Sequence, residues 1–369
     1  MIKFDVIVVG AGIAGASVAA EIGGHCKVLL LEAESMPGFH ATGRSAAFWS
    51  ECYGGSGVQS LTKASGGMLA KPPADFADRP FMTPRGAMHI EVPGPRDLTG
   101  AMLKDFAGSG ANIGRADGAK IQKLVPRVRD EWCTGVWEPD CCDIDVAALH
   151  NAYLRRARLH STTLVCNARV TSATLHSGTW AITTTNGQFT GGLLVNAAGA
   201  WADDLAAISG VTKAGIQPFR RSIAQIDVGP GVDPAMPLVM GLDGSFYFKA
   251  NADGSIWLSP HDETPVVAGD VVPEELDIAA AIHRFEQVTN WQVSTVQHKW
   301  AGLRSFAPDR LPVIGRDADR SEFFWLAGQG GFGIQTAPAI AQLAASQILG
   351  TDHLMPNVDA DSFSPARLR

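Results

Sequence analysis

The beginning of the chain holds the feature that most limits its fold, a short apolar run followed at once by closely spaced glycines. Residues 5–9 read Asp-Val-Ile-Val-Val, which is typical of a buried strand in a parallel sheet. Residues 10–15 carry the glycines, and residues 16–22 are rich in alanine and suit a helix. A second apolar run over 27–31 ends at Glu32. This order of strand, glycine turn, helix, strand and acid predicts a βαβ unit that binds a dinucleotide.

Each part of this pattern has a physical reason. Gly10 permits the sharp turn off the strand, Gly12 lets a pyrophosphate approach the backbone, and Gly15 lets the helix pack closely on the sheet. The helix N-terminus offers free N–H groups to the phosphates. Glu32 lies where its carboxylate can accept hydrogen bonds from ribose hydroxyls, and no arginine follows it to suit a 2′-phosphate. NADP is therefore disfavoured, while FAD and NAD both stay open.

Size and composition exclude several classes of protein. The 369 residues suggest about two domains, and 46% hydrophobic residues can bury a large core. A net charge of −7 gives no reason to expect a nucleic-acid partner. The six cysteines form no CxxC pair, which favours reduced thiols, a cytoplasmic protein and no metal site. No apolar run reaches the roughly 20 residues that span a bilayer, so membrane association is not indicated.

Two later segments repeat the transition from an apolar strand to a glycine turn. They lie at 193–201 and at 323–333, and the second is followed by a predicted helix over 337–349. The pattern predicts an α/β (α+β) chain with a discontinuous Rossmann-like nucleotide domain and an antiparallel-sheet substrate domain. The predicted boundaries are 1–80, 143–215 and 299–369 for the nucleotide domain, and 81–142 and 216–298 for the substrate domain.

Six short motifs occur in order along the chain, and together they resemble a known family. They are residues 40–47 (HATGRSAA), 195–201, 219–222, 245–247, 300–306 and 328–336. Over essentially the whole chain this set resembles the FAD-dependent D-amino acid oxidase/dehydrogenase superfamily, and within it the bacterial D-arginine dehydrogenases. The resemblance implies FAD as the cofactor. Some members of this family bind the flavin covalently through a cysteine late in the chain. No cysteine follows Cys166 here, so the resemblance implies non-covalent FAD.

The resemblance also implies a set of site residues. Arg221 and Arg304 match the binders of the substrate carboxylate, Tyr53 and Tyr247 match active-site tyrosines, and Gly331 matches a glycine whose carbonyl accepts a bond from the substrate amine. The neighbour of Arg221 is also an arginine, so the strand register there stays open. The implied FAD contacts are Gly10, Gly12, Ile13, Ala14, Gly15, Glu32, Ala33, Arg44, Ser45, Ala46, Val170, Ala198, Gly199, Gly302, Gly330, Gly331, Gly333, Ile334, Gln335 and Thr336.

The chain departs from the D-arginine dehydrogenases at two positions of the substrate pocket. Phe48 stands in place of a histidine, and Ala87 in place of a glutamate that receives the guanidinium. Without that carboxylate a buried cationic side chain would lack a partner, which is costly. The sequence therefore predicts an uncharged side-chain pocket. The candidate lining residues are Phe48, Trp49, Ala87, Met88 and Met240.

The leading functional hypothesis is oxidation of a D-amino acid. The two arginines would orient the substrate so that hydride passes from Cα to flavin N5, and the imino acid would hydrolyse to a 2-oxo acid and ammonia. Oxygen or a quinone would accept the electrons. Alternatives are oxidation of N-substituted amino acids such as sarcosine or an opine, oxidation of 2-hydroxy acids, a flavin subunit of a larger oxidase complex and, less favoured, an NAD-dependent dehydrogenase.

Overall fold

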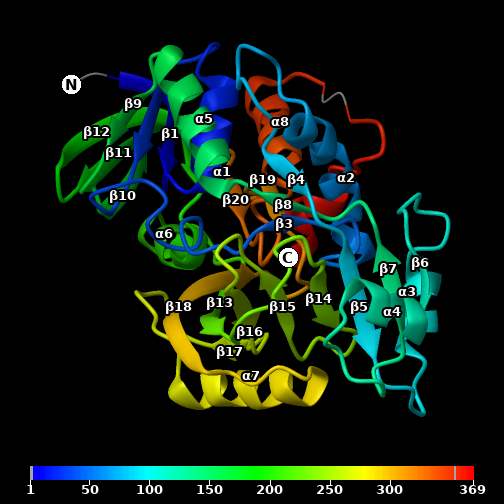
Figure 1. Cartoon of the computed structure of the whole chain (residues 1–369). Coiled ribbons are helices and arrows are strands. Elements are labelled where there is room, and N and C mark those ends of the chain that lie inside the picture. The colour runs from blue at the N-terminus through cyan, green and yellow to red at the C-terminus, as the bar shows by residue number, and fades with distance from the viewer. Residues whose placement is uncertain (1–2, 353–354) are drawn as a thin grey trace.

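The computed structural model describes residues 3–352 and 355–369, and its first sheet confirms the predicted α/β fold (Figure 1). The strand order is β10-β11-β12-β1-β2-β9, with β20 beside β12 and β19 beside β20. Strands β1, β2, β9, β12 and β20 run parallel. The strands are β1 (Lys3–Val9), β2 (Val28–Leu31), β9 (Thr163–Val165), β10 (Val170–His176), β11 (Thr179–Thr184), β12 (Gly187–Asn196), β19 (Val313–Arg316) and β20 (Phe323–Ala327).

Helices cover both faces of this sheet. Successive side chains of a strand point to opposite faces. Val6 and Val8 pack in one apolar cluster with the helices α1, α2, α5 and α8, whereas Ile7 packs on the other face in a cluster that includes α6. The central strand therefore reads as a continuous apolar run. The helices are α1 (Ile13–Ile22), α2 (Ser56–Ala70), α5 (Val146–Leu159), α6 (Ala202–Ile208) and α8 (Ala337–Leu349).

The second sheet has nine strands in the order β17-β13-β16-β15-β14-β5-β7-β6, with β18 beside β13. All its pairs are antiparallel except β14 with β5. Helix α7 (Glu275–Val288) covers its outer face, away from the first sheet (Figure 1). The strands are β5 (Ala87–Glu91), β6 (Gly114–Asp117), β7 (Thr134–Glu138), β13 (Gln217–Asp227), β14 (Leu238–Gly241), β15 (Tyr247–Ala250), β16 (Ile256–Ser259), β17 (Thr264–Pro265) and β18 (Thr295–Phe306).

A small third sheet is formed by three short strands. It joins β3 (Phe48–Trp49), β8 (Cys142–Ile144) and β4 (Met82–Pro84) in the order β3-β8-β4. The remaining helices are α3 (Leu98–Asp105), α4 (Gly118–Leu124) and the 3₁₀ helices at Gly199–Trp201, Asp361–Phe363 and Pro365–Leu368.

The boundaries inferred from the sequence remain a proposal for how the chain divides into domains. Every strand of the first sheet falls inside the segments assigned to the nucleotide domain. Strand β18 starts before residue 299 and ends after it, and β8 likewise spans the boundary at 143. Because β18 is paired along its whole length with β13, we propose that the boundary lies after Phe306.

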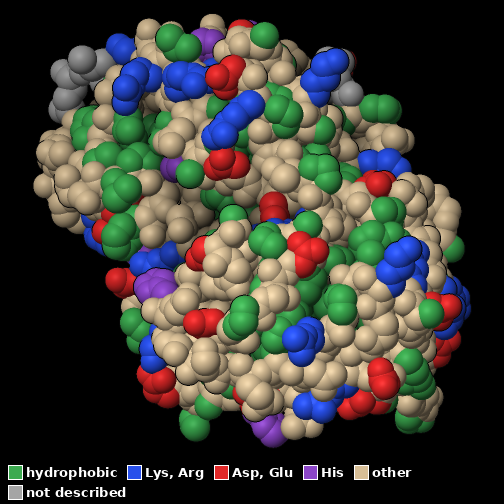
Figure 2. All heavy atoms as spheres, viewed as in Figure 1, with side chains coloured by type: hydrophobic (Ala, Val, Ile, Leu, Met, Phe, Trp, Pro, Cys, Tyr) green, Lys and Arg blue, Asp and Glu red, His purple; other side chains and the backbone are tan. Residues whose placement is uncertain are grey.

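On the face shown in Figure 2, positive and negative side chains are interspersed and form no large patch of one charge. Within residues 3–352 and 355–369, no helix has the length and apolar character needed to cross a membrane. The six cysteines form no disulfide with one another in the structure.

Candidate active site

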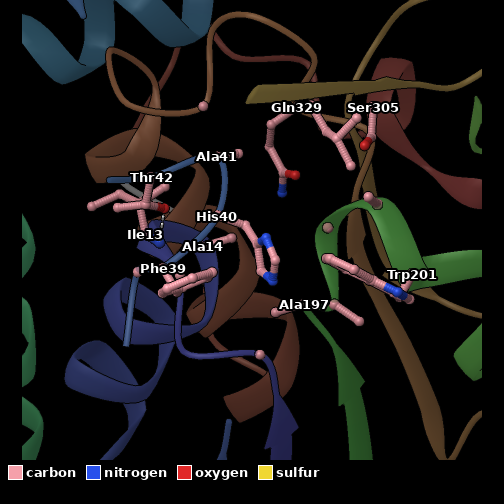
Figure 3. A pocket seen from close by; sticks show the side chains of 18 of the residues that line it. Ile13, Ala14, Phe39, His40, Ala41, Thr42, Ala197, Trp201, Ser305 and Gln329 are labelled. Carbon is pink, nitrogen blue, oxygen red and sulfur yellow. Dashed lines mark hydrogen bonds between the residues drawn. The ribbon is translucent and has the colours of Figure 1, made fainter. Parts of the chain in front are cut away.

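A cavity of about 440 Å³ lies between the carboxyl ends of the parallel strands and the inner face of the second sheet. Val9 and Ala197 line it from the ends of β1 and β12, and Arg221, Tyr247 and Arg304 line it from the second sheet. Figure 3 shows side chains around this space from several segments of the chain. Those labelled include Ile13, Phe39, His40 and Thr42 on one side, Ala197 and Trp201 opposite, and Gln329 and Ser305 at the far end.

The glycine turn is as tight as the sequence pattern requires. Gly10 has φ +103°, and a Cβ there would lie 2.3 Å from the carbonyl oxygen of Ala197. A Cβ on Gly15 would lie 1.8 Å from the carbonyl oxygen of Gly10. Side chains at these two positions cannot fit without moving backbone atoms. The turn therefore brings helix α1 close against the ends of β1 and β12, as in sites that hold a pyrophosphate.

Glu32 and Thr42 fix the entrance of helix α1. Glu32 is buried at the end of β2, and its Oε2 accepts a hydrogen bond of 2.9 Å from the Ala11 amide. Thr42 Oγ1 accepts a bond of 3.0 Å from the Ile13 amide, as the dashed line in Figure 3 marks. The carboxylate keeps further lone pairs for ribose hydroxyls. Sequence reasoning missed Thr42, because its partner lies 29 residues earlier in the chain.

Most of the predicted cofactor residues line the cavity. They are Gly10, Gly12, Ile13, Ala14, Glu32, Ala33, Arg44, Ser45, Ala46, Val170, Ala198, Gly199, Gly330, Gly331, Gly333 and Ile334. The lining extends from Glu32 and Val170 to Arg304, which suits an elongated dinucleotide. Four predicted residues lie outside this lining, namely Gly15, Gly302, Gln335 and Thr336.

These four residues support the wall from behind. Gly15 packs against Gly10, and Gly302 packs against Arg44. The Gln335 amide donates bonds of 3.1 Å to the Tyr53 carbonyl and 2.9 Å to Thr62 Oγ1. The Thr336 hydroxyl donates to the Phe332 carbonyl at 2.8 Å. The side chains of Gln335 and Thr336 are therefore bonded within the protein, and none of the four residues lines the cavity.

Arg221 and Arg304 project from one face of the β13–β18 ribbon. In its register Arg221 lies opposite Gly302 and Arg304 lies opposite Phe219, so the two arginines are diagonal neighbours on the same face. Arg220 points to the other face, where it pairs with Glu274 and, at 2.8 Å, with Asp277 of α7. This alternation resolves the register that the sequence left open, and only Arg221 of the two neighbours reaches the cavity.

The two guanidinium groups raise the local positive charge. Burial and then the charge of Arg304 lower the pKa of Arg221 to about 10. Arg304 Nη1 donates to the Tyr53 hydroxyl, and within the described residues Arg221 Nη1 is buried without a hydrogen-bond partner. Burial raises the pKa of Tyr247, which keeps its hydroxyl protonated. An anion placed between the two arginines would relieve their repulsion and satisfy the free donor.

An apolar wall stands next to the tyrosines, and only part of it matches the prediction. Phe48, Ala87 and Met240 are buried and pack in one cluster with Tyr247 and Tyr53, and of these five residues Tyr247 alone lines the cavity. Phe48 meets the Tyr53 ring edge-on at a centroid distance of 4.8 Å.

Trp49 and Met88 were wrongly predicted to belong to this wall. Trp49 packs in the core of the first sheet and donates to the Thr62 carbonyl at 2.9 Å, while Met88 lies in the core beneath α7. Each follows a wall residue in a strand, and strand alternation sends it to the opposite face.

His261 lies beside the two tyrosines, although no motif distinguishes it from the other histidines in the sequence. Its ring lies 5.7 Å from that of Tyr247 and 6.4 Å from that of Tyr53. Its Nδ1 is 2.5 Å from the Gly244 carbonyl oxygen, so Nδ1 carries the proton and Nε2 is a hydrogen-bond acceptor. Burial, then the charges of Arg221 and Arg304, lower the pKa of His261 to about 3. The imidazole is therefore neutral at ordinary working pH.

Replacing His261 with asparagine is expected to flatten the acid side of the stability profile. His261 titrates at about 3 when folded and near its model value of 6.5 when unfolded, so between these values the unfolded chain binds the extra proton. Wild-type stability then falls as the pH drops through this window, by about 2 kcal/mol between pH 7.5 and pH 5 at about 1.4 kcal/mol per unit. Asparagine tolerates the positive φ of this position, +55°. Urea-unfolding midpoints at both pH values check this, and equal losses in both proteins would contradict it.

No group of three or more His, Cys, Asp or Glu side chains in the described parts of the chain is arranged to hold a metal ion. The cavity wall instead offers backbone around the glycine turn, one carboxylate and two arginines. These donors suit a dinucleotide and an anionic substrate.

Known proteins with the same architecture support this description. A glycine oxidase from Geobacillus kaustophilus superimposes with a TM-score of 0.86 at 20% identity, covering 100% of this chain and 99% of that one. An L-proline dehydrogenase from P. horikoshii superimposes with a TM-score of 0.85 at 20% identity, covering 99% and 97%. At this identity the likeness concerns the fold.

The relatives found by sequence are much longer than the part of them that matches this chain. The dimethylglycine dehydrogenase of Rattus norvegicus is 25% identical over 273 residues, which are 67% of this chain and 31% of the relative. A bifunctional protein of tRNA 5-methylaminomethyl-2-thiouridine biosynthesis from Maricaulis maris is 33% identical over 149 residues, or 40% of this chain and 23% of the relative. The chain thus spans less than a third of the length of these relatives.

A family model described as FAD dependent oxidoreductase matches residues 5–347. That range includes the glycine turn, both cavity arginines and the late glycine segment. The predicted family and cofactor are confirmed: the chain belongs to the DAO family of FAD-dependent oxidoreductases, and its cofactor is FAD.

Proposed function

We propose that this protein oxidises the Cα–N bond of a D-amino acid with an uncharged side chain, giving an imino acid that hydrolyses to a 2-oxo acid and ammonia. The observation that carries the proposal is the pair of buried guanidinium groups on one face of β13–β18, beside an apolar wall. FAD, when bound, accepts the hydride from the substrate. The D configuration rests on the resemblance of the site motifs to the D-amino acid oxidases and dehydrogenases.

In this proposal the chain holds FAD without a covalent bond. The Gly10–Gly15 turn and the start of α1 bind the pyrophosphate, and Glu32 accepts hydrogen bonds from the ribose. Val170 contacts the adenine end. The segments Arg44–Ala46 and Gly330–Ile334 contact the flavin end of the cofactor, where both line the cavity near Arg304.

Arg304 and Arg221 bind the substrate carboxylate. A guanidinium fork matches a carboxylate with parallel charged hydrogen bonds, and this fixes the substrate before reaction. Tyr53 and Tyr247 orient the substrate from the side, and the Gly331 carbonyl accepts a bond from the amine. A Cβ at position 331 would lie 2.8 Å from Arg304 Nη1, so a side chain there would displace the guanidinium.

The charges behind the apolar wall support an uncharged side chain. Lys249 is buried and pairs with Asp143 at 2.8 Å, and Arg85 pairs with the same carboxylate at 2.5 Å. His89 and Glu138 are 3.3 Å apart and both are buried. These groups balance one another, so a charged substrate side chain would meet no free countercharge here and would lose its hydration.

A second candidate is oxidation of an N-substituted amino acid. The sequence match to a protein described as dimethylglycine dehydrogenase favours it. The two arginines would serve any α-carboxylate, so they do not distinguish the candidates.

Anaerobic mixing with a substrate panel tests the proposal. The panel contains D- and L-alanine, D-leucine, D-phenylalanine, D-arginine, sarcosine, dimethylglycine and lactate, and the readout is loss of flavin absorbance. We expect bleaching by uncharged D-amino acids at least tenfold faster than by D-arginine. Preferential bleaching by sarcosine or dimethylglycine would select the second candidate, and preference for D-arginine would refute the uncharged pocket. Reoxidation of the bleached enzyme by oxygen or by a soluble quinone then identifies the electron acceptor.

A further inference from the structure

Arg221 is held by two consecutive residues of the segment that follows β16. Its Nε donates a bond of 2.7 Å to the Asp262 carbonyl, and its Nη2 donates a bond of 3.0 Å to Glu263 Oε1. Nε and Nη2 form one side of the guanidinium fork, so this side is fully used by the protein. The end of the fork, with both hydrogens of Nη1, is left for a ligand.

Glu263 is itself fixed from its outer side. Arg310 Nη2 lies 2.9 Å from both carboxylate oxygens of Glu263, and the Arg310 guanidinium stacks 3.9 Å from the centroid of the Phe306 ring. Asp262 is anchored to β13, since its carboxylate accepts bonds of 2.7 Å and 2.9 Å from the Ser222 amide and hydroxyl. Glu263 therefore stands in a defined place between a buried and a half-exposed arginine.

Charge counting gives this arrangement a consequence for the substrate. Arg221 and Arg304 carry two positive charges at the cavity, and two carboxylates next to Arg221 offset part of them: Asp262, and Glu263, which also pairs with Arg310. The neutral His261 adds none. One substrate carboxylate then offsets the remaining positive charge, whereas a second carboxylate would add a further negative charge to a buried, weakly screened site that already holds the Glu263 carboxylate.

We propose that Glu263 is a positioning residue that presents the end of the Arg221 fork to the substrate and restricts the site to acids with a single carboxylate. This inference rests on the proposed function, because it assigns the two arginines to a substrate carboxylate. It adds the substrate class, monocarboxylic amino acids, and the residue that excludes dicarboxylic ones.

The test measures the binding of propanoate and succinate to the oxidised holoenzyme by perturbation of the flavin spectrum. Wild type is expected to bind propanoate more tightly than succinate. Glu263→Gln keeps an acceptor for Arg221 but removes the charge, so the ratio of the two dissociation constants is expected to shift about tenfold toward succinate. Glu263→Ala also loses the acceptor, and propanoate binding is expected to weaken as well.

Two further variants guard against unspecific effects. Arg310→Met removes a positive charge beyond Glu263, and the ratio is expected to shift about threefold in the opposite direction, toward propanoate. Glu274→Gln is the matched control, since Glu274 pairs with Arg220 on the opposite face of the same strand. This control is expected to leave the ratio unchanged.

The outcomes separate this inference from the proposed function. A shift of less than threefold in Glu263→Gln, or an equal shift in Glu274→Gln, overturns the inference. If the shift occurs but no D-amino acid bleaches the flavin, the inference stands and the proposed substrate fails. If D-amino acids bleach the flavin and the ratio does not move, only the role of Glu263 fails. Wild type that binds neither acid refutes the carboxylate site itself.

Discussion

Replacing Arg304 with alanine is expected to lower kcat/KM for the best D-amino acid about a thousandfold. Arg304 lines the cavity and its side chain packs against Gly331. Its guanidinium donates a hydrogen bond to the Tyr53 hydroxyl. Loss of a buried charged partner of the substrate carboxylate costs about 4 kcal/mol, which corresponds to this factor. Steady-state kinetics on preparations with matched flavin content measure it.

Two comparisons distinguish loss of the guanidinium from damage to the fold. Arg304→Lys keeps the charge but not the planar fork, so an intermediate loss is expected. Added guanidinium chloride is expected to restore part of the activity of the alanine variant and none to wild type. An alanine variant that retains more than a tenth of the activity would show that Arg304 does not bind the reacting acid.

Replacing Gly15 with alanine is expected to abolish flavin retention. The new Cβ would lie 1.8 Å from the carbonyl oxygen of Gly10, so helix α1 must move away from the glycine turn. That movement displaces the backbone donors proposed to hold the pyrophosphate. The ratio of flavin absorbance to protein absorbance after purification is expected to fall at least tenfold.

Gly67 provides the matched control for this substitution. It lies in helix α2 with no atom within 4 Å of a built Cβ, and its φ is not in the left-handed region. Gly67→Ala is therefore expected to keep the flavin and to raise stability by about 0.5–1 kcal/mol, because alanine is the better helix former. A Gly15→Ala protein with a full complement of FAD would refute the role of the tight turn.

The nucleotide half of the fold could be predicted because its signals are local. A buried strand, a glycine turn and an acid at the end of the next strand lie within 32 residues, and each residue type meets a requirement of the backbone there. The end of the second sheet's strand β18, and with it the domain boundary, was harder to predict from the sequence. Strand β18 crosses the boundary predicted at residue 299 because its pairing with β13 decides where it ends, and that pairing joins segments about 80 residues apart.

The candidate site could be predicted where single residues carry the chemistry, and less well where packing decides. Tyr53, Tyr247, Arg221 and Arg304 come together in the structure. His261 was missed, because its role depends on a bond to Gly244 and on charges brought in by the β13–β18 ribbon.

The wrong predictions, Trp49 and Met88, each concern a residue that directly follows a correctly grouped residue in a strand. Phe48 and Trp49 were both expected in the pocket, as were Ala87 and Met88, yet strand alternation places one of each pair, Phe48 and Ala87, in the cluster with Tyr53 and Tyr247. The sequence of a short strand does not predict which of its two faces is turned toward the cavity. The neighbouring strands decide that.

In the proposed function, the ribbon of β13 and β18 binds the carboxylate that all amino acids share, whereas β3, β5 and β14 supply the apolar wall proposed to meet the side chain. Recognition is thus divided between separate pieces of the molecule. On this proposal, exchanges at Phe48, Ala87 or Met240 are expected to adapt the enzyme to new side chains while the two arginines stay in place. Evolution and engineering share this freedom, and libraries restricted to those positions are the economical route to altered specificity.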